Sequence, residues 1–288
     1  MKPAKFRYFS PTSVEDALTL VSTQDDDTRF LAGGQSLVPM MNFRVATPSV
    51  LIDLNQVSKL KNIVIDETGR LQIGAMTRIR QLETDPVIAN SNPLLAEATK
   101  HIAHVQIRNR ATLGGSLAHA DPAAELPGIT LACDAEIHLQ GKDVSRVIAA
   151  TNFFEGVFST ALMQKEIITK IIFPAWPTSR HWAFQEVARR EGDFALVGIA
   201  AWFDVDTTGK ISETRITAIG AGDRPLRLIS AEEILTGEVP TTELFETVAT
   251  AAMQDVDPAG DIHASVAYRR EVAGVLVTRV LGEAWTRG

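Results

Sequence analysis

The most informative part of the sequence is Ile107-Arg108-Asn109-Arg110-Ala111-Thr112-Leu113-Gly114-Gly115-Ser116, in which a glycine pair lies between two hydroxyl side chains. A second pair occurs in Ala32-Gly33-Gly34-Gln35-Ser36, after a short apolar segment. Because glycine has no Cβ, each pair lets backbone N–H groups turn toward one point and lets an anion approach them. Ser36 and Thr112 can add hydroxyl donors. Two such loops facing each other could hold a pyrophosphate, and the alternative is two ordinary tight turns.

The residues around the earlier glycine pair predict a small α/β unit. Thr12–Gln24 is expected to form a helix, because Thr12 and Glu15 have capping-box spacing and apolar residues follow on one face. Arg29–Ala32 is short and mostly apolar, and Val50–Leu54 has the composition of a buried strand. A strand, a helix and a strand in this order favour parallel pairing.

The middle of the chain is expected to combine antiparallel strands with helices. Asn62–Asp66 and Arg70–Gly74 flank a Glu-Thr-Gly turn, which is a hairpin pattern. Helices are expected to begin near Thr77 and near Pro93, whereas Ile107–Asp121 has little regular periodicity. The other elements expected here are a helix at Glu125–Cys133, a hairpin of Ala135–Leu139 and Val144–Ala149, and a strand at Glu166–Phe173.

Pro174-Ala175-Trp176-Pro177-Thr178-Ser179 is the best linker candidate, because its two prolines disfavour both helix and central strand. The residues beyond it predict an antiparallel sheet backed by helices. Strands are expected at Trp182–Arg189, Ala195–Val205 and Ile211–Ile219, and helices at Ala231–Leu235, Thr242–Gln254 and Ser265–Trp285. The predicted parts of the chain are residues 1–57, 58–176 and 177–288.

Composition excludes several classes of protein. The chain has 288 residues, of which 45% are apolar, and this is enough for a buried core. Its formal net charge of -7 argues against nucleic acid as a partner. Cys133 is its one cysteine, so this chain alone cannot build a disulfide framework or ligate an iron–sulfur cluster through cysteines. With no secretory signal and no apolar run of about 18 residues, a cytoplasmic location without an integral membrane segment is expected.

Other motifs predict no catalytic or metal site. Gly220-Ala221-Gly222 lacks the third glycine of a dinucleotide fingerprint and is interpreted as a turn. His101 and His104 have i,i+3 spacing on an expected helix, but no third metal ligand lies nearby, and a surface or core position is favoured. His119-Ala120-Asp121 has no accompanying nucleophile motif, and Cys133 is expected to be an inert buried thiol.

Two charged segments leave alternatives open. Arg189–Phe194 is either a solvated hairpin turn or a loop whose aromatic residue, Phe194, covers a planar ligand. Arg108-Asn109-Arg110 precedes the later glycine pair and could face an anion or a partner protein.

Taken together, these stretches resemble the FAD-binding medium subunits of molybdenum hydroxylases. The family includes carbon monoxide dehydrogenase, the flavin domain of xanthine dehydrogenase and enzymes that hydroxylate N-heteroaromatic rings. The resemblance extends over nearly the whole chain and is most specific at residues 107–116. The other matching segments are Phe6–Thr12, Leu31–Pro39, Ile52–Leu54, Ile73–Thr77, Ala118–Pro127, Arg189–Ala195 and Tyr268-Arg269. The resemblance implies an α+β protein: a two-subdomain FAD-binding fold of the vanillyl-alcohol-oxidase (PCMH-like) type, then a C-terminal three-stranded antiparallel sheet with a helical layer.

The resemblance also implies a non-covalent FAD site. The glycine stretches would hold the pyrophosphate, Asp121 would lie near the ribityl or adenosine portion, and Leu54 and Phe194 would lie near the flavin rings. Gln35 stands where many relatives have histidine, and Ser116 where many have asparagine. No catalytic or metal-binding residue is expected in this chain. The implied cofactor-binding residues are Ala32, Gly33, Gly34, Gln35, Ser36, Leu37, Leu54, Ala111, Thr112, Gly114, Gly115, Ser116, Asp121, Arg190 and Phe194.

The function implied by the resemblance is electron transfer in a larger complex. Substrate would be oxidised at a molybdenum cofactor in a large partner subunit, and electrons would pass through two [2Fe–2S] clusters of a small partner to this chain's FAD. An external acceptor would then reoxidise the flavin. The implied assembly is a dimer of heterotrimers, and the expected substrate is an N-heteroaromatic compound of the quinoline type. The alternatives are a stand-alone FAD-dependent oxidoreductase with its own substrate pocket and a non-catalytic nucleotide-binding scaffold.

Overall fold

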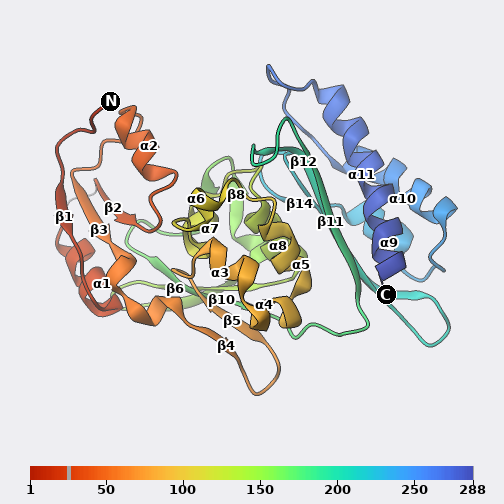
Figure 1. Ribbon diagram of the computed structural model, residues 1–288, viewed down its shortest axis with the longest axis horizontal. Helices are drawn as coiled ribbons and strands as arrows, with labels where there is room; N and C mark the ends of the chain where they lie inside the picture. Colours follow the sequence, from red (N-terminus) through yellow and green to blue (C-terminus); the bar gives the residue numbers. More distant parts are fainter. Residues whose placement is uncertain (25–26, 288) are drawn as a thin grey trace.

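In the computed structural model, three main sheets follow one another from the N-terminal to the C-terminal end of the molecule (Figure 1). The structure describes residues 1–24 and 27–287. Helices pack against each sheet, and the buried hydrophobic side chains form three clusters. This mixed arrangement confirms the predicted α+β class. No helix in the described part of the chain is long and apolar enough to cross a membrane.

The N-terminal part is a parallel sheet in the order β1–β3–β2, with the fully buried strand β3 at its centre. The predicted parallel pairing is confirmed. Ser13, rather than Thr12, caps α1, because the Ser13 hydroxyl accepts a hydrogen bond from the Asp16 N–H at 3.0 Å. The elements of this part are β1 (Arg7–Phe9), α1 (Val14–Thr23), β2 (Thr28–Leu31), α2 (Leu37–Asn42), β3 (Val50–Asp53), and the 3₁₀ helices η1 (Leu54–Gln56) and η2 (Ser58–Lys61).

The central part is an antiparallel sheet in the order β4–β5–β10–β6–β7. Both predicted hairpins are confirmed. The strands are β4 (Ile63–Ile65), β5 (Leu71–Gly74), β6 (Glu136–Gln140), β7 (Ser145–Ala149), β8 (Phe154–Gly156), β9 (Ser159–Thr160) and β10 (Ile167–Phe173). The helices are α3 (Ile79–Thr84), α4 (Pro86–Ser91), α5 (Pro93–Thr99), α6 (Val105–Arg108), α7 (Leu113–His119), α8 (Glu125–Ala132) and η3 (Ala150–Asn152).

Two expectations for the central helices are wrong. The stretch expected to be irregular, Ile107–Asp121, contains the end of α6 and the whole of α7. These helices have four and seven residues, too few for a periodic apolar face to be visible in sequence. His101 and His104 lie in the turn after α5 rather than on a helix. Within the described residues, no group of three or more histidine, cysteine or acidic residues could hold a metal ion.

The C-terminal part is an antiparallel sheet in the order β11–β12–β13–β14, covered by helices on its outer face. The three predicted strands are present, and the two-residue strand β14 adds a fourth. Phe203 points into the cluster beneath the helices, whereas Phe184 and Trp202 point into the cluster of the central part. The elements are β11 (His181–Ala188), β12 (Ala195–Val205), β13 (Ile211–Ile219), β14 (Leu226–Arg227), α9 (Ile229–Leu235), α10 (Thr242–Asp255) and α11 (Val266–Arg287).

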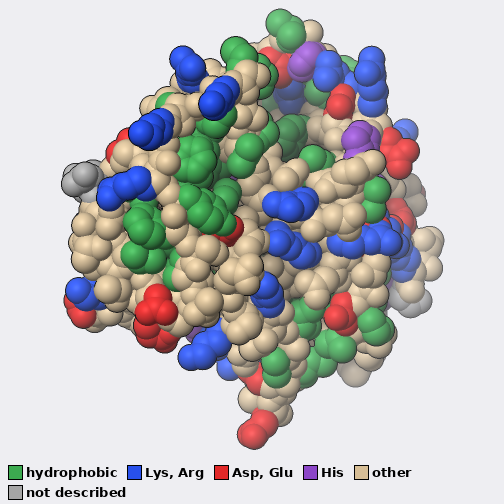
Figure 2. All heavy atoms as spheres, turned by 60° about the vertical axis from the view of Figure 1, so that its left-hand side comes forward, with side chains coloured by type: hydrophobic (Ala, Val, Ile, Leu, Met, Phe, Trp, Pro, Cys, Tyr) green, Lys and Arg blue, Asp and Glu red, His purple; other side chains and the backbone are tan. Residues whose placement is uncertain are grey.

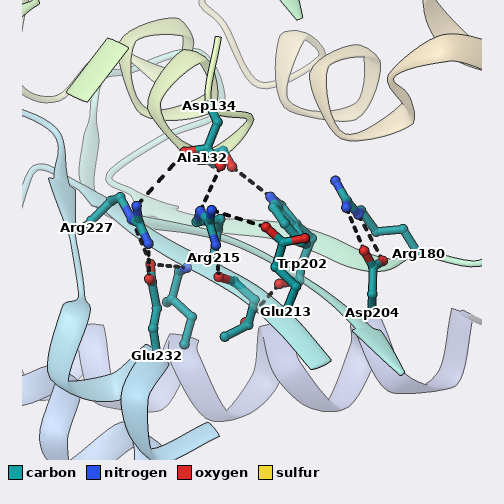
Figure 3. A network of polar contacts seen from close by, with 11 residues as sticks. Ala132, Asp134, Arg180, Trp202, Asp204, Glu213, Arg215, Arg227 and Glu232 are labelled. Carbon is teal, nitrogen blue, oxygen red and sulfur yellow. Dashed lines mark hydrogen bonds and ion pairs between the residues drawn. The ribbon is translucent and has the colours of Figure 1, made fainter. Parts of the chain in front are cut away.

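A polar network joins the C-terminal sheet to the end of α8 (Figure 3). The indole N–H of Trp202 donates to the Ala132 carbonyl at 2.7 Å, and Arg215 Nε lies 2.8 Å from Asp134 Oδ2. The Arg180 guanidinium lies 3.5 Å from the centre of the Trp202 ring. The C-terminal sheet is therefore fixed in position relative to the central helices.

Candidate functional site

The first glycine loop, residues 32–36, leaves β2 at the edge where the parallel strands β2 and β3 both end. Ligands commonly bind at this edge of a parallel sheet. Within the described residues, the backbone N–H groups of residues 33–36 have no hydrogen-bond acceptor. Gly34 has a φ of 74°, which favours glycine. Successive N–H groups without acceptors can surround an anion.

The second glycine segment, residues 111–116, has a different conformation, because Gly114 and Gly115 form the first turn of α7. Gly114 N–H donates to the Ala75 carbonyl at 2.8 Å, and Gly115 N–H donates to the Thr112 hydroxyl at 3.1 Å. These amides therefore have acceptors within the chain, which differs from the expected clamp of amides from both pairs. Thr112 and Gly114 are buried, whereas Gly115 and Ser116 are partly exposed.

The two glycine stretches are in direct contact. An ideal Cβ on Gly33 would lie only 2.3 Å from the Arg110 carbonyl oxygen and 2.7 Å from the Ala111 Cα. A Cβ on Gly115 would lie 3.3 Å from the Ala32 Cβ. The predicted convergence of the two stretches is therefore present, and glycine at position 33 permits it.

A chain of hydrogen bonds, which sequence reasoning missed, ties the two stretches together. The Asn55 side-chain amide donates to the Ala32 carbonyl at 2.8 Å, and Arg78 Nη2 donates to Asn55 Oδ1 at 2.5 Å. Arg78 Nη1 donates to the Arg110 carbonyl. Asp53 orients Asn55 by accepting from its backbone N–H at 2.8 Å. The only signal for this bridge in the sequence is the position of Asp53 and Asn55 at the end of a buried strand.

The bridge also brings positive charge next to the first glycine loop. Burial and the neighbouring Arg110 charge lower the pKa of Arg78. The Asp53 carboxylate acts in the opposite direction and raises the pKa of Arg78. Seen from the N-terminal side, Lys and Arg side chains gather across the middle of the surface, beside a group of hydrophobic side chains (Figure 2). A guanidinium group beside open N–H groups suits a phosphate-bearing ligand.

One of the remaining predicted contacts, Asp121, lies just beyond the far end of α7. Asp121 follows this helix, and its carboxylate accepts from the Ala123 N–H at 2.9 Å. The next residue, Pro122, accepts from Gly220 N–H at 2.9 Å. A Cβ on Gly220 would lie 2.5 Å from the Leu196 carbonyl oxygen, close to Phe194 in sequence. The segments that carry Asp121 and Phe194 are therefore neighbours.

The end of α7 at His119 lies four residues beyond Gly115, which is about 6 Å at 1.5 Å rise per residue. Phe194 is 61% exposed, and Arg190 is exposed on the same loop between β11 and β12. An exposed aromatic side chain at the rim is suitable for covering a planar ring. Leu54, by contrast, is buried in the N-terminal cluster. Among the predicted contacts, Gly33, Leu54, Thr112 and Gly114 are buried, and the others are partly or fully exposed.

Two buried carboxyl groups, those of Glu125 and Glu186, lie near the part of the site that carries Asp121 and Arg190. Burial raises the pKa of Glu125 to about 7, and burial together with the Glu125 charge raises the pKa of Glu186 to about 8. The Cys133 thiol is also buried, and its pKa is raised to about 12, which agrees with the predicted inert thiol. The arrangement can bind an elongated ligand with phosphate near Gly33 and a ring near Phe194.

Comparisons with known proteins extend over nearly the whole chain. Residues 4–176 match the FAD binding domain in molybdopterin dehydrogenase, and residues 182–284 match the carbon monoxide dehydrogenase flavoprotein C-terminal domain. In Paenarthrobacter nicotinovorans, the 6-hydroxypseudooxynicotine dehydrogenase complex subunit alpha is 42% identical, with 100% of this chain and 97% of the relative covered. The nicotine 6-hydroxylase medium subunit of the same organism is 39% identical, with 100% of both chains covered. A chain of carbon monoxide dehydrogenase from Hydrogenophaga pseudoflava superposes with a TM-score of 0.96 at 37% identity, covering 100% of this chain and 99% of that one.

Proposed function

We propose a cofactor site, a substrate class and an assembly for this protein from one premise: the chain belongs to the FAD-binding medium subunits of molybdenum hydroxylases. Its fold is the family's two-part FAD-binding fold followed by the C-terminal flavoprotein domain. It is the flavoprotein component of an oxidoreductase whose large and small partner subunits carry the molybdenum cofactor and the [2Fe–2S] clusters.

FAD, when bound, accepts electrons from the iron–sulfur clusters and passes them to an external acceptor. The single observation that carries the proposed site is the row of open N–H groups at residues 33–36 beside the Arg78 bridge. These groups would bind the pyrophosphate, and Arg78 would hold the two glycine stretches at a fixed separation. Gly114 would act by close packing, because a Cβ there would lie 2.5 Å from the Ala75 Cβ.

The proposed cofactor-contacting set keeps all the residues expected from the sequence. Ala32, Gly33, Gly34, Gln35, Ser36 and Leu37 would surround the pyrophosphate together with Ala111, Thr112, Gly115 and Ser116, and Gly114 would support them by packing on Ala75. Asp121, Arg190, Phe194 and Leu54 are assigned to the remaining parts of FAD. Support for the flavin end comes from the exposed position of Phe194 and the neighbouring segment that carries Asp121.

The proposed substrate class is N-heteroaromatic. Two relatives that match the whole chain are named for nicotine and for 6-hydroxypseudooxynicotine, and nicotine contains a pyridine ring. The substrate pocket itself would lie on the large subunit.

The proposed assembly is a dimer of heterotrimers in the cytoplasm. The proposed division is into residues 1–57, 58–176 and 177–288, and support for it comes from the three separate main sheets. Measuring the mass of the purified complex tests the stoichiometry.

The test of the proposed site is FAD binding by the co-expressed three-subunit complex, followed by its flavin absorption spectrum and its content of FAD, iron and molybdenum. Arg78→Gln is expected to lower FAD affinity by roughly 10-fold or more, because a charge-assisted hydrogen bond is lost. Arg80→Gln is the matched control, since Arg80 lies two residues away and contacts Glu83 instead. A wild-type complex that contains iron and molybdenum but no FAD would contradict the proposal.

A further inference from the structure

A buried carboxyl group lies at the interface between the central and C-terminal parts. Glu186 is on the face of β11 that packs on the central part, as is Phe184 two residues earlier. The Glu186 side chain is 7% exposed, and its Oε2 atom has no hydrogen-bond partner in the described part of the chain. Buried polar atoms normally have partners, so an unpartnered carboxyl oxygen at this position is unusual.

Glu186 is the middle member of a group of three titratable side chains. His101 Nδ1 lies 3.7 Å from Glu186 Oε1, which is ion-pair distance, and the imidazole contacts the Phe184 ring edge-on at 5.1 Å. Glu125, the first residue of α8, lies on the inner side and is 4% exposed. The His101 side chain is 36% exposed, so the group extends from solvent into the interior.

The group adjoins residues that are proposed to contact the flavin end of FAD. A cavity of about 580 Å³ is lined by His101, Glu186 and Arg190, the last of which belongs to the proposed site. On the inner side, the Asp121 charge acts on Glu125. Glu186 therefore shares a cavity with Arg190, and its neighbour Glu125 is acted on by the Asp121 charge.

At neutral pH, the protonation states of Glu186 and His101 are suitable for proton donation by Glu186. With its pKa raised to about 8 by burial and by the charge of Glu125, Glu186 carries a proton at pH 7. Burial lowers the pKa of His101, so its ring is neutral. The charged groups around this pair are Glu97 and Lys100 from α5 and the turn after it, Glu125 from α8, and Arg189, Arg190 and Glu191 from the loop after β11.

We propose that Glu186 and His101 form a proton-exchange site for the flavin, a role that rests on the FAD site proposed above. Iron–sulfur clusters deliver electrons without protons, whereas the two-electron reduction of FAD takes up at least one proton. The Glu186 carboxylic acid gives this proton and becomes a carboxylate. His101 then takes a proton from water at the cavity and passes it to the carboxylate, which restores the starting state. Two electrons from the partner's clusters and one proton from solvent balance the reduction.

The experiment uses the intact FAD-loaded complex, reduced by a light flash with a photosensitiser. It follows flavin reduction by absorbance and proton uptake with a pH-indicator dye. Glu186→Gln is expected to slow flavin reduction roughly 100-fold, the size of a general-acid contribution, with cluster reduction unchanged. In the wild type, the rate of flavin reduction falls as pH rises through about 8, and this inflection disappears in the variant. Glu246→Gln on the exposed face of α10 is the matched control and retains wild-type behaviour.

A second measurement does not depend on turnover. The infrared carbonyl band of a protonated carboxylic acid in the oxidised complex is expected to titrate near pH 8 and to be missing in Glu186→Gln. A FAD-loaded variant with the wild-type rate and pH profile would overturn the proton-exchange site alone. A wild-type complex without FAD would overturn the proposed function. If the Glu186→Gln complex does not retain FAD, the same experiment uses the His101→Asn complex instead. A rate of proton uptake within twofold of wild type in that complex would overturn the inference.

Discussion

Replacing Gly33 by alanine tests whether the contact between the two glycine stretches sets FAD affinity. The added methyl group would lie 2.3 Å from the Arg110 carbonyl oxygen, 2.7 Å from the Ala111 Cα and 2.9 Å from the Arg110 carbonyl carbon. All three atoms belong to the backbone, so no side chain can rotate away. An ordinary contact needs roughly 3.5 Å, so the stretches must separate by about 1 Å.

This separation moves the open N–H groups of residues 33–36 out of register with a pyrophosphate. Losing one charge-assisted hydrogen bond costs about 1.5–3 kcal/mol, which corresponds to a Kd higher by roughly 10- to 150-fold. Overpacking itself destabilises the fold by about 1–3 kcal/mol. Flavin fluorescence titration of the reconstituted complex measures the first effect, and thermal unfolding measures the second.

Gly282→Ala is the matched control for the same substitution. Gly282 lies in α11, where a Cβ would meet no atom within 4 Å. Alanine there is expected to leave FAD binding unchanged and to stabilise the helix by about 0.5–1 kcal/mol. If Gly33→Ala binds FAD within twofold of the control, the contact does not govern the site and the reasoning fails.

Three further predictions concern buried groups. Cys133 is expected to stay unreactive toward a disulfide reagent at pH 8 until urea unfolds the protein, and rapid labelling of the native protein would contradict its burial. Glu232→Ala is expected to destabilise the protein by about 1–3 kcal/mol in urea unfolding, because it leaves the buried Ile216 N–H without its acceptor and Arg227 with only the Asp134 carboxylate at 4.0 Å; a loss below about 1 kcal/mol would contradict this. Burial raises the pKa of Glu125 above its ordinary 4.5, so the native state holds more protons than the unfolded state, and stability falls as pH rises from about 4.5 through about 7. Glu125→Gln should flatten that part of the curve, and an unchanged slope would refute the assignment.

The sequence predicts the long strands well. Ala195–Val205 and Ile211–Ile219 have in the structure the bounds expected from their pattern, because each is a long run of strand-forming residues ended by a turn. The short helices α4, α6 and α7 were not predicted, since four to seven residues cannot show a helical period and their stability comes from tertiary packing.

The candidate site is only partly visible in sequence. Both glycine pairs could be found from residue type alone, because glycine at a close approach has no substitute. The bridge through Asn55 and Arg78 could not, since residues 32, 55, 78 and 110 meet only through tertiary folding. Arginine and asparagine at such spacings occur on ordinary surfaces, and nothing in their local pattern indicates that they contact one another.

The two glycine pairs look alike in sequence but serve different purposes in the structure. Gly33 and Gly34 leave N–H groups open, whereas Gly114 and Gly115 use theirs within the chain and let α7 approach Ala75 closely. The second pair therefore affects the site indirectly, because it positions the Arg110–Ala111 backbone against the first loop. Substitution at Gly114 should then weaken FAD binding by displacing this backbone, even though no amide of Gly114 is available to the cofactor. The backbone contact at Gly33, rather than the number of amides aimed at the ligand, is the feature on which both glycine stretches depend.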